Sequence, residues 1–493
     1  MILAAVLSAC YPAPRSAAPP HLSPVAQLQR DLDAILAAPA LEHSVWGVLI
    51  KSLASDETLY GVNAGRLLMP ASNMKIVTLA AAAERLGWDY RYETRVFGSA
   101  PIEAGAGVLH GDLIVVGSGD PSIGGRSGPP TRVFDAWADE LRDLGLRQVD
   151  GRIVGDDRAF EDRRLGAGWA WDDLGEGYAA GAGALQFNEN GVRATIAPGQ
   201  AVGDPAIVTL EPAGSGLVVQ NELKTAPEDA LPSIRAQRLP GGARTELRGL
   251  VPLSRAPTSH TVSVDDPALF FVTVLRNTLI ARGIDVRGPP VNRADIRDID
   301  AVASSGAAPA LLLSYRSPPL SSLAVTLMKV SQNLYAETLL KTIGAAGGSP
   351  TTDAGRASAR SAVLGWGVEA GELIMRDGSG LSRYNYATPQ TLVTILTHVD
   401  RDEKLREPFE SALPIAGQDG TLAGRMIDTA AAGNARAKTG SIANARALSG
   451  YVRTSDGEPL VFSIIANNFE TPPSAVEQTT DTIVARLATF SRR

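Results

Sequence analysis

The sequence predicts an α+β protein in which a helix–strand domain is interrupted by a long β-rich insertion. Three observations lead to this fold class. Helical and strand patterns follow one another between residues 25 and 86, short strands and glycine turns dominate from about 92 to 286, and helical patterns return after residue 321. A chain of 493 residues, 44% of them hydrophobic, is long enough to bury several cores.

The first part of the chain alternates between helix and strand. Residues 25–37 carry apolar side chains at steps of three and four, which is typical of an amphipathic helix. Residues 44–50 are typical of a strand, and residues 57–60 follow a short polar turn as its hairpin partner. An alanine-rich run then predicts a helix over 73–86, which Gly87 ends.

The insertion and the C-terminal part carry further signals for secondary structure. Residues 111–117 predict a strand that leads into a tight turn at 119–122. No internal repeat is visible in the sequence. Elsewhere we expect helices at 135–144, 267–281, 321–340, 354–363 and 475–490, and a pair of strands at 447–452 and 460–467.

The charge composition argues against a nucleic acid or another polyanion as partner. The chain has 46 basic and 53 acidic residues, a formal net charge of −7, and no long basic run. Only seven of the basic residues are lysines. Because arginine cannot deprotonate in a protein whereas a desolvated lysine can, each lysine in a suggestive context is informative.

The N-terminal residues 1–26 have features of an export signal followed by a tether. Residues 1–9 form a short apolar run, and the segment that ends at Cys10 is similar to the lipobox at which bacterial lipoproteins are cleaved and lipidated. The tract that follows is rich in Pro, Ala and Ser, which favours a flexible tether. No basic residue precedes the short run, so an export remnant is the alternative. The segment predicts a periplasmic or envelope location, with Cys10 as candidate lipid anchor.

The first motif with chemical meaning is Ser72-Asn73-Met74-Lys75. On a helix, residues three apart share a face, so the hydroxyl of Ser72 and the ammonium of Lys75 can be neighbours. Ser72 stands where the predicted helix begins, and the helix dipole there stabilises negative charge on its oxygen. For Lys75 to act as a base, its pKa must fall from about 10.4 towards 7–8. The competing interpretation is a helix-capping serine followed by a surface lysine.

The second motif is Ser331-Gln332-Asn333. A serine hydroxyl can pass a proton between a base and a leaving group, and a carboxamide can orient a substrate amide. On its own this pattern has little specificity, and a solvated junction between a helix and a loop is the alternative.

The third motif is Lys438-Thr439-Gly440-Ser441, which precedes an apolar strand. A lysine and a hydroxyl at the start of a strand can hold a substrate carboxylate, and Gly440 allows the backbone to approach closely. The alternative is an edge strand that a lysine protects from aggregation.

The order of the three motifs is more informative than any one of them. The succession S-x-x-K, S-x-N and K-T-G is typical of serine β-lactamases and penicillin-binding proteins. Ser72 is the only serine of the chain with a lysine three positions later, and Ser331 follows it by 259 positions. This distance is much longer than a β-lactamase needs.

With these motifs, the sequence resembles the D-alanyl-D-alanine carboxypeptidase/endopeptidase family, the low-molecular-mass penicillin-binding proteins with inserted domains. The resemblance extends over about residues 27–470. Further segments that carry it are Gly117-Ser-Gly-Asp-Pro-Ser122, Gly168-Trp-Ala-Trp-Asp-Asp-Leu174, Phe187-Asn-Glu-Asn190, Ser317-Pro-Pro-Leu320, Asp377-Gly-Ser-Gly-Leu-Ser-Arg383 and Leu413-Pro-Ile-Ala-Gly-Gln-Asp-Gly-Thr421.

The resemblance implies a division into domains. It implies a β-lactamase/transpeptidase-like catalytic domain, an antiparallel sheet flanked by helices, at 27–93 and 312–493. It further implies an inserted domain II at 94–185 and 264–311, and a β-rich domain III at 186–263 nested within it.

The resemblance also implies catalytic roles for five residues. Ser72 would attack the carbonyl between the two terminal D-alanines of a peptidoglycan stem peptide, and Lys75 would accept its proton. Ser331 would help to pass that proton to the leaving amine, Asn333 would contact the substrate backbone, and Lys438 would hold the terminal carboxylate. Water would hydrolyse the acyl-enzyme, whereas a β-lactam antibiotic would remain attached as a covalent inhibitor. Neither a metal nor a cofactor is expected.

Substrate binding is expected from neighbouring residues. Thr439 would join the preceding lysine on the carboxylate, Gly440 would admit the substrate backbone, and the N–H of Ser441 would complete an oxyanion hole with the N–H of the nucleophile. Asp172 and Asp173 lie beside two tryptophans of the insertion, and Asp173 is our candidate for recognising the amine of a diamino-acid stem residue. A structural role of both carboxylates in a turn is the alternative.

Two differences from the family pattern concern the third motif. Ser441 stands where threonine is more common, although it retains a hydroxyl and a backbone donor. Ala443 and Asn444 replace an expected glycine-containing stretch.

Several other functions fit part of these observations. A β-lactamase is the nearest, but no E-x-x-x-N or E-x-x-L-N segment between the first two motifs supplies a deacylating glutamate. An esterase of the same fold would use the same serine and lysine. A Ser-His-Asp esterase lacks its G-x-S-x-G elbow here. A non-catalytic wall-binding protein would be favoured by the loss of a motif residue, and none is lost. The sequence leaves the balance between carboxypeptidase and endopeptidase activity open.

Overall fold

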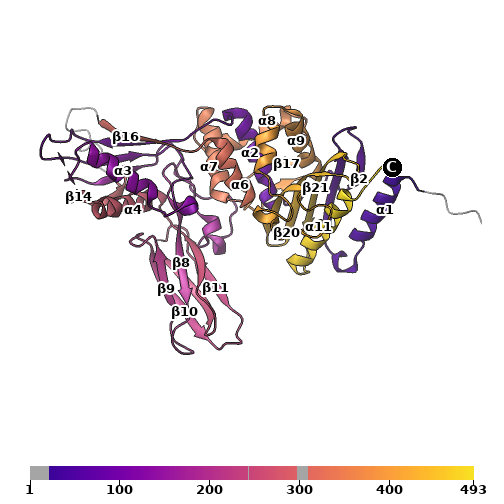
Figure 1. Ribbon diagram of the computed structural model, residues 1–493, viewed down its shortest axis with the longest axis horizontal. Helices are drawn as coiled ribbons and strands as arrows, with labels where there is room; N and C mark the ends of the chain where they lie inside the picture. The colour runs from indigo at the N-terminus through magenta and orange to yellow at the C-terminus, as the bar shows by residue number, and fades with distance from the viewer. Residues whose placement is uncertain (1–21, 243, 297–308) are drawn as a thin grey trace, which may run out of the picture.

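The computed structural model describes residues 22–242, 244–296 and 309–493. Its helices and strands confirm the α+β class (Figure 1). The Cys10 lipobox and most of the predicted tether lie outside the described residues. The helices are α1 Pro24–Leu36, α2 Met74–Leu86, α3 Arg132–Asp143, α4 Pro267–Ala281, α6 Leu320–Lys329, α7 Asn333–Ala346, α8 Thr352–Gly365, α9 Pro389–Arg401, α10 Arg406–Ala412 and α11 Pro473–Ala488.

A five-stranded antiparallel sheet forms the centre of the part that carries the three motifs. Its order is β19-β20-β21-β1-β2, so strands from both ends of the chain are neighbours. β19 is an edge strand, and its free side faces the turn that holds Ser72. The bounds are β1 Val45–Ser52, β2 Thr58–Val62, β19 Arg436–Ile442, β20 Ala445–Arg453 and β21 Pro459–Asn467.

Helices cover both faces of this sheet because its strands are apolar on both sides. In β1, Val48 and Ile50 pack into the core that α1 and α11 share, whereas Leu49 packs into the core of α2, α6, α7 and α9. This alternation is the expected period of two. The core that contains Leu49 also contains the almost fully buried helix α2, which carries Lys75 and thereby places this lysine in the interior.

The insertion builds a second five-stranded sheet in the order β15-β7-β5-β3-β16. Helices α3 and α4 pack on it through an aromatic cluster that includes Phe134, Trp137 and Phe271. A short sheet, β14-β6-β4, lies beside it. The bounds are β3 Glu93–Gly98, β4 Val108–Leu109, β5 Leu113–Val116, β6 Gln148–Val149, β7 Ile153–Asp156, β14 Asp285–Val286, β15 Pro290–Asn292 and β16 Ala310–Arg316.

The chain enters and leaves the insertion at one place. The N–H of Tyr92 donates to Ser317 Oγ at 2.9 Å, and the N–H of Ser317 donates to the Tyr92 carbonyl at 3.0 Å. The strands that follow and precede these residues, β3 and β16, pair antiparallel up to Arg316. The predicted return boundary at 311/312 therefore falls inside a strand. The division into domains remains a prediction.

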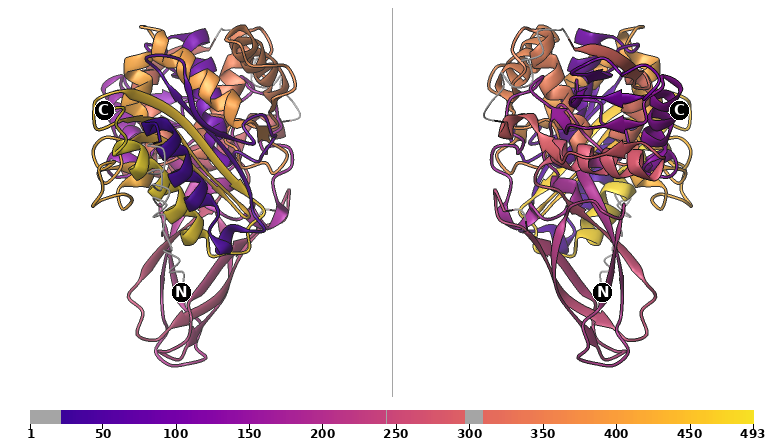
Figure 2. Two further views of the ribbon diagram at one scale, coloured as in Figure 1. Left: turned by 90° about the vertical axis from the view of Figure 1, so that its right-hand side faces the viewer. Right: turned by 90° about the vertical axis from the view of Figure 1, so that its left-hand side faces the viewer.

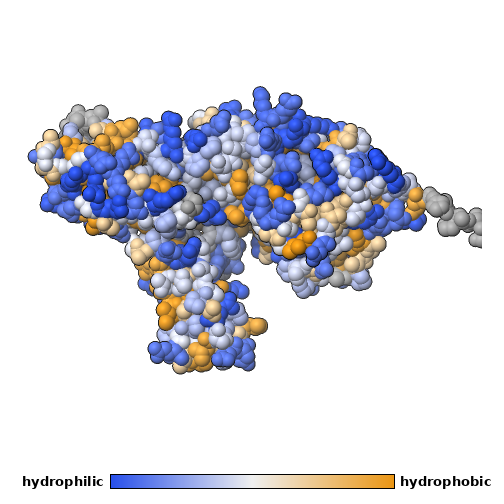
Figure 3. All heavy atoms as spheres, viewed as in Figure 1, coloured by the Kyte–Doolittle hydropathy of each residue, from blue (hydrophilic) through white to orange (hydrophobic). Residues whose placement is uncertain are grey.

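Two three-stranded sheets project from the insertion (Figures 1 and 2). They enclose a small core of their own, with Leu223 and Leu247 fully buried. On the face that Figure 3 shows, hydrophobic residues form small groups among hydrophilic ones on this projection. The sheets are β13-β8-β9, with β8 Gly191–Ala197, β9 Ile207–Glu211 and β13 Thr258–Ser263, and β10-β12-β11, with β10 Val218–Ala226, β11 Ser233–Gln237 and β12 Arg244–Pro252.

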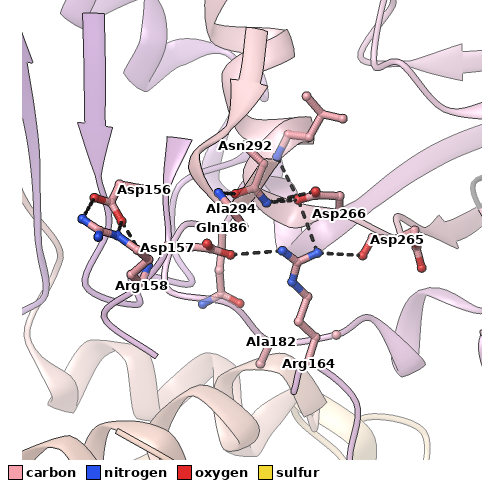
Figure 4. A network of polar contacts seen from close by, with 12 residues as sticks. Asp156, Asp157, Arg158, Arg164, Ala182, Gln186, Asp265, Asp266, Asn292 and Ala294 are labelled. Atoms are coloured by element: carbon pink, nitrogen blue, oxygen red, sulfur yellow. Dashed lines mark hydrogen bonds and ion pairs between the residues drawn. The ribbon is translucent and has the colours of Figure 1, made fainter. Parts of the chain in front are cut away.

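A polar network centred on Arg164 joins distant segments of the insertion (Figure 4). The guanidinium lies 3.3 Å from Asp157 Oδ2 and 3.3 Å from Asp266 Oδ1, and it donates to the Asp265 carbonyl. Asn292 donates to both carboxylate oxygens of Asp266 at 3.0 Å. This network holds the loop that begins near residue 157. Further along the same loop, Asp173 and Tyr178 lie at the candidate site.

The expected helix over 321–340 is wrong in one respect. It is two helices, α6 and α7, separated by residues 330–332, because Ser331 has a left-handed φ of 62° that no α-helix accommodates. The other expected helices and strands are present with small shifts of their ends. No described helix has both the length and the apolar composition to cross a membrane.

Candidate active site

Ser72 lies in a tight turn that leads into α2. Residues Ala71–Asn73 form a single 3₁₀ turn, and Ala71 has a left-handed φ of 46°. Two glycines allow other segments to approach this turn. A Cβ atom on Gly380 would lie 1.8 Å from the Ala71 carbonyl oxygen, and one on Gly440 would lie 2.6 Å from the Pro70 carbonyl oxygen. Close backbone packing therefore fixes where the Ser72 hydroxyl points.

Lys75 is fully buried, and its ammonium has three oxygen partners. It donates to Ser72 Oγ at 2.9 Å, to Asn333 Oδ1 at 2.6 Å and to the Ser379 carbonyl at 2.7 Å. None of these partners is a carboxylate. Burial lowers the pKa of Lys75 to about 7, although the charges of Asp377 and Glu337 act in the opposite direction. Lys75 thus has the proton affinity that a general base needs at neutral pH.

The second motif bends back onto this lysine. Ser331 occupies the left-handed bend between α6 and α7, and Asn333 is the first residue of α7. The carboxamide of Asn333 accepts from Lys75 and donates to the Tyr178 carbonyl at 2.7 Å. Asn333 therefore joins Lys75 to the insertion. Gln332 caps α7 by accepting from the N–H of Leu334.

The third motif lies on β19. Lys438 Nζ donates to Ser331 Oγ at 2.8 Å and to the Thr439 carbonyl at 2.8 Å. Burial, followed by the charge of Lys75, lowers the pKa of Lys438 well below its usual value. The Thr439 hydroxyl donates to Thr421 Oγ1 at 2.8 Å. The alternative interpretation as an edge strand is correct for β19, but Lys438 points inward and is not a surface gatekeeper.

The turn after the third motif is short. β19 ends at Ile442 and β20 begins at Ala445, so Ala443 and Asn444 alone connect them. Asn444 has a φ of 62°, a conformation that asparagine adopts more readily than most residues. Asparagine therefore meets the conformational need for which a glycine was expected.

A cleft of about 420 Å³ joins the motifs to the insertion. Asp173 is at its wall, where its Oδ1 accepts from the Tyr178 hydroxyl at 2.7 Å. Asp172, its neighbour, is exposed and does not line this cleft among the described residues. Gly440 also does not line it, and its role here is close packing. The lining residues are Ser72, Asp173, Tyr178, Ser331, Asn333, Leu381, Arg383, Thr421, Thr439, Ser441, Ile442 and Ala443.

Sequence reasoning assigned no role to several of these residues. Leu381, Arg383 and Thr421 belong to segments that resemble the family, which was the available signal. Tyr178 carried no signal in the sequence, because only the fold of the insertion brings it to the cleft. Trp169, on the same loop, donates to the buried Asp377 Oδ2 at 2.8 Å.

The sequence that supplies this serine, the two buried lysines and the carboxamide matches a known family over most of the chain. Residues 28–490 match the model described as "D-Ala-D-Ala carboxypeptidase 3 (S13) family". The chain belongs to this S13 family. As a family member it is a serine-type D-Ala-D-Ala carboxypeptidase, and the recognition made from the motifs is confirmed. The matched family is described by the carboxypeptidase activity that the motifs predicted, rather than as a β-lactamase or an esterase.

Two relatives with known sequences support the S13 assignment. The chain is 35% identical over 479 residues to a D-alanyl-D-alanine carboxypeptidase of Actinomadura sp. strain R39, with 94% of this chain and 85% of the relative covered. It is 25% identical over 435 residues to the D-alanyl-D-alanine carboxypeptidase DacB of Haemophilus influenzae, with 87% of each covered.

A solved structure agrees with the S13 fold. Penicillin-binding protein 4 (dacB) from Haemophilus influenzae superposes with a TM-score of 0.79 at 24% identity, and the match covers 94% of this chain and 99% of that one. The expected fold class, including the long insertion, is therefore confirmed.

Proposed function

We propose that this carboxypeptidase cleaves peptidoglycan stem peptides through an acyl-enzyme on Ser72. The observation that carries the proposal is the 2.9 Å contact between Lys75 Nζ and Ser72 Oγ inside a buried site. Neutral Lys75 takes the hydroxyl proton while Ser72 Oγ attacks the carbonyl carbon of the penultimate D-alanine. The backbone N–H groups of Ser72 and Ser441 are the proposed donors to the oxyanion, and each such donor typically contributes about 2.7–4 kcal/mol.

The second half of the reaction returns the proton. As the C–N bond to the terminal D-alanine breaks, its amine needs the proton that Lys75 has accepted. We assign the transfer to Ser331, since its hydroxyl accepts from Lys438 and lies in the same cleft as Ser72. Free D-alanine then leaves, and water hydrolyses the ester on Ser72 to restore the serine and release the shortened peptide.

Groups around the cleft would bind and orient the substrate. Lys438 and Thr439 would hold the terminal carboxylate, with Gly440 allowing the strand to lie close, and Asn333 would contact the substrate amide. Asp173 would bind a side-chain amine of the stem peptide, which its half-buried position in the cleft wall supports. The same cleft would accept an internal cross-link, so endopeptidase activity uses the same serine.

Intact-mass measurement after incubation with a penicillin tests this proposal. The wild-type protein is expected to gain the mass of one drug molecule, and Ser72→Ala is expected to gain none. An exposed serine outside the cleft, replaced as Ser55→Ala, serves as control and should acylate like the wild type. An unlabelled wild type with intact drug would favour a non-catalytic wall-binding protein, and hydrolysed drug without an adduct would point to β-lactamase activity.

We also propose that the protein acts in the periplasm or cell envelope. The lipobox-like segment at Cys10 supports a lipid anchor, and the substrate class requires export. Metabolic labelling with a palmitate analogue in a bacterial host, compared with Cys10→Ser, tests the anchor. Label on the wild type but not on Cys10→Ser supports the lipid anchor. Unlabelled wild-type protein in the soluble envelope fraction would mean that the protein is exported but not lipidated.

A further inference from the structure

Glu337 is a buried carboxylate near the catalytic lysine that the mechanism above does not use. It lies one helical turn after Asn333 on α7, and only 4% of it is exposed. Its Oε1 accepts from the N–H of Gly378 at 3.1 Å and from the N–H of Ser379 at 2.8 Å. A buried carboxylate that binds two successive backbone donors fixes the conformation of that segment.

The segment that Glu337 holds is itself in contact with the base. The carbonyl of Ser379 accepts from Lys75 at 2.7 Å, whereas the N–H of the same residue donates to Glu337. One residue later, Gly380 packs against the Ala71 carbonyl next to the nucleophile. Thus a single turn, residues 377–380, contacts the lysine on one side and the serine turn on the other.

Charged groups from three segments act on Lys75. Glu337 on α7 and Asp377 in the turn are the negative groups, and Lys438 on β19 is the other positive group. Glu337 in turn is near Asp377 and Lys341. Burial, followed by the charge of Asp377, raises the pKa of Glu337 to about 7. Among the described residues no carboxylate contacts Lys75 directly, so these charges act on it from a distance and oppose the larger effect of burial.

We propose that Glu337 is a positioning residue for acylation, which holds the Gly378–Ser379 peptide so that the Ser379 carbonyl aims Lys75 at Ser72. When ionised, Glu337 also adds to the charge of Asp377 in opposing the effect of burial on Lys75. The inference rests on the proposed roles of Ser72 and Lys75.

Two substitutions of Glu337 separate its role in holding the Gly378–Ser379 peptide from the effect of its charge on Lys75. Glu337→Gln keeps the shape and one acceptor oxygen but removes the charge, whereas Glu337→Asp keeps the charge but shortens the reach. Thr342→Val on the same helix is the matched control. Its hydroxyl bonds with the Tyr92 hydroxyl at 2.9 Å, it is buried, and it lies away from Lys75.

The experiment measures the second-order rate constant of acylation by a penicillin between pH 5 and 9, together with the melting temperature. For Glu337→Gln we expect the acid limb of the profile to move down by about one pH unit, because Lys75 loses a nearby negative charge. The plateau should fall about tenfold, because the turn is held less well. Glu337→Asp should keep the wild-type limb with a lower plateau, and Thr342→Val should change only the melting temperature.

The outcomes distinguish this inference from the proposed function. Acylated wild type with an unchanged limb and plateau in Glu337→Gln would overturn the inference alone. A wild type that is not acylated would overturn the proposed function instead. If Glu337→Gln does not fold, Glu337→Asp decides, because a wild-type plateau in that variant excludes a positioning role.

Discussion

Lys438 Nζ lies 2.8 Å from Ser331 Oγ, although 107 positions separate the two residues in the chain. The contact joins the edge strand β19 to the bend between α6 and α7. Lys438 is fully buried, and its ammonium donates to the Thr439 carbonyl as well as to Ser331 Oγ.

Replacement of this lysine should therefore affect proton transfer. For Lys438→Gln we expect acylation by a penicillin to slow about 10²–10⁴-fold, the range typical of lost acid–base assistance. Stopped-flow or quenched intact-mass kinetics measure the rate. The exposed Lys404→Gln is the control, and a wild-type rate in both variants would remove Ser331 and Lys438 from the proton path.

The pH dependence of the wild type follows from the lowered pKa of Lys75, about 7. Only the neutral amine accepts a proton, and its fraction grows as the pH rises through that value. The kcat/KM for a D-alanyl-D-alanine peptide should therefore fall about tenfold per unit below pH 6 and level off above pH 8. A flat profile from pH 5 to 8 would contradict a lysine base with this pKa.

Asp173 should decide whether a side-chain amine is recognised. For the wild type we expect a kcat/KM about tenfold higher with a free-amine stem peptide than with its N-acetylated form, consistent with one charge-assisted contact. Asp173→Asn should bring this ratio close to one. The neighbouring Asp172→Asn, which lies outside the cleft, should retain the wild-type preference. If the two variants behave alike, both carboxylates have structural roles only.

Lys341 should anchor the loop that carries Asp173 and Tyr178. Its buried ammonium donates to the carbonyls of Arg163 at 2.5 Å and Ala182 at 3.1 Å, which bracket that loop. Lys341→Met leaves both carbonyls unpaired, at about 1–3 kcal/mol each.

We expect Lys341→Met to lower the melting temperature by several degrees and to raise KM for the peptide more than it lowers kcat. Differential scanning fluorimetry and steady-state kinetics measure both. The exposed Lys224→Met provides the comparison. A change in kcat alone would show that the loop is held by other contacts.

Gly440 should tolerate no side chain, since a Cβ atom there would meet the Pro70 carbonyl oxygen at 2.6 Å. Gly440→Ala is expected to cost about 1–3 kcal/mol of folding free energy and to slow acylation by displacing β19 from the Ser72 turn. Urea unfolding measures the stability. Gly65→Ala, with open space around its Cβ position, should match the wild type.

Local signals in the sequence predicted most helices. The helix at 267–281 has the predicted ends because Asp266 caps it and Pro267 occupies its first turn. Thr388 and Pro389 give α9 the same kind of start, so that missed helix was predictable. The break at Ser331 was not, because its left-handed bend depends on contacts with β19 that no local window contains.

For the site, the order of the motifs predicted that five residues would lie together. These are Ser72, Lys75, Ser331, Asn333 and Lys438. Their contacts in the structure agree with that grouping. The walls of the cleft were less accessible to sequence reasoning. Tyr178 enters the cleft only through the path of the insertion. Glu337 did carry a usable sign, its spacing of four from Asn333, which places both on one helix face.

The paired bonds between Tyr92 and Ser317 mean that the two ends of the insertion meet. A segment whose ends meet can be gained, lost or exchanged between related genes while the central sheet and its three motifs keep their own connections. Yet this segment contributes Asp173 and Tyr178 to the cleft. Exchange of this one segment could therefore change which wall peptide is accepted, without altering Ser72 or Lys75.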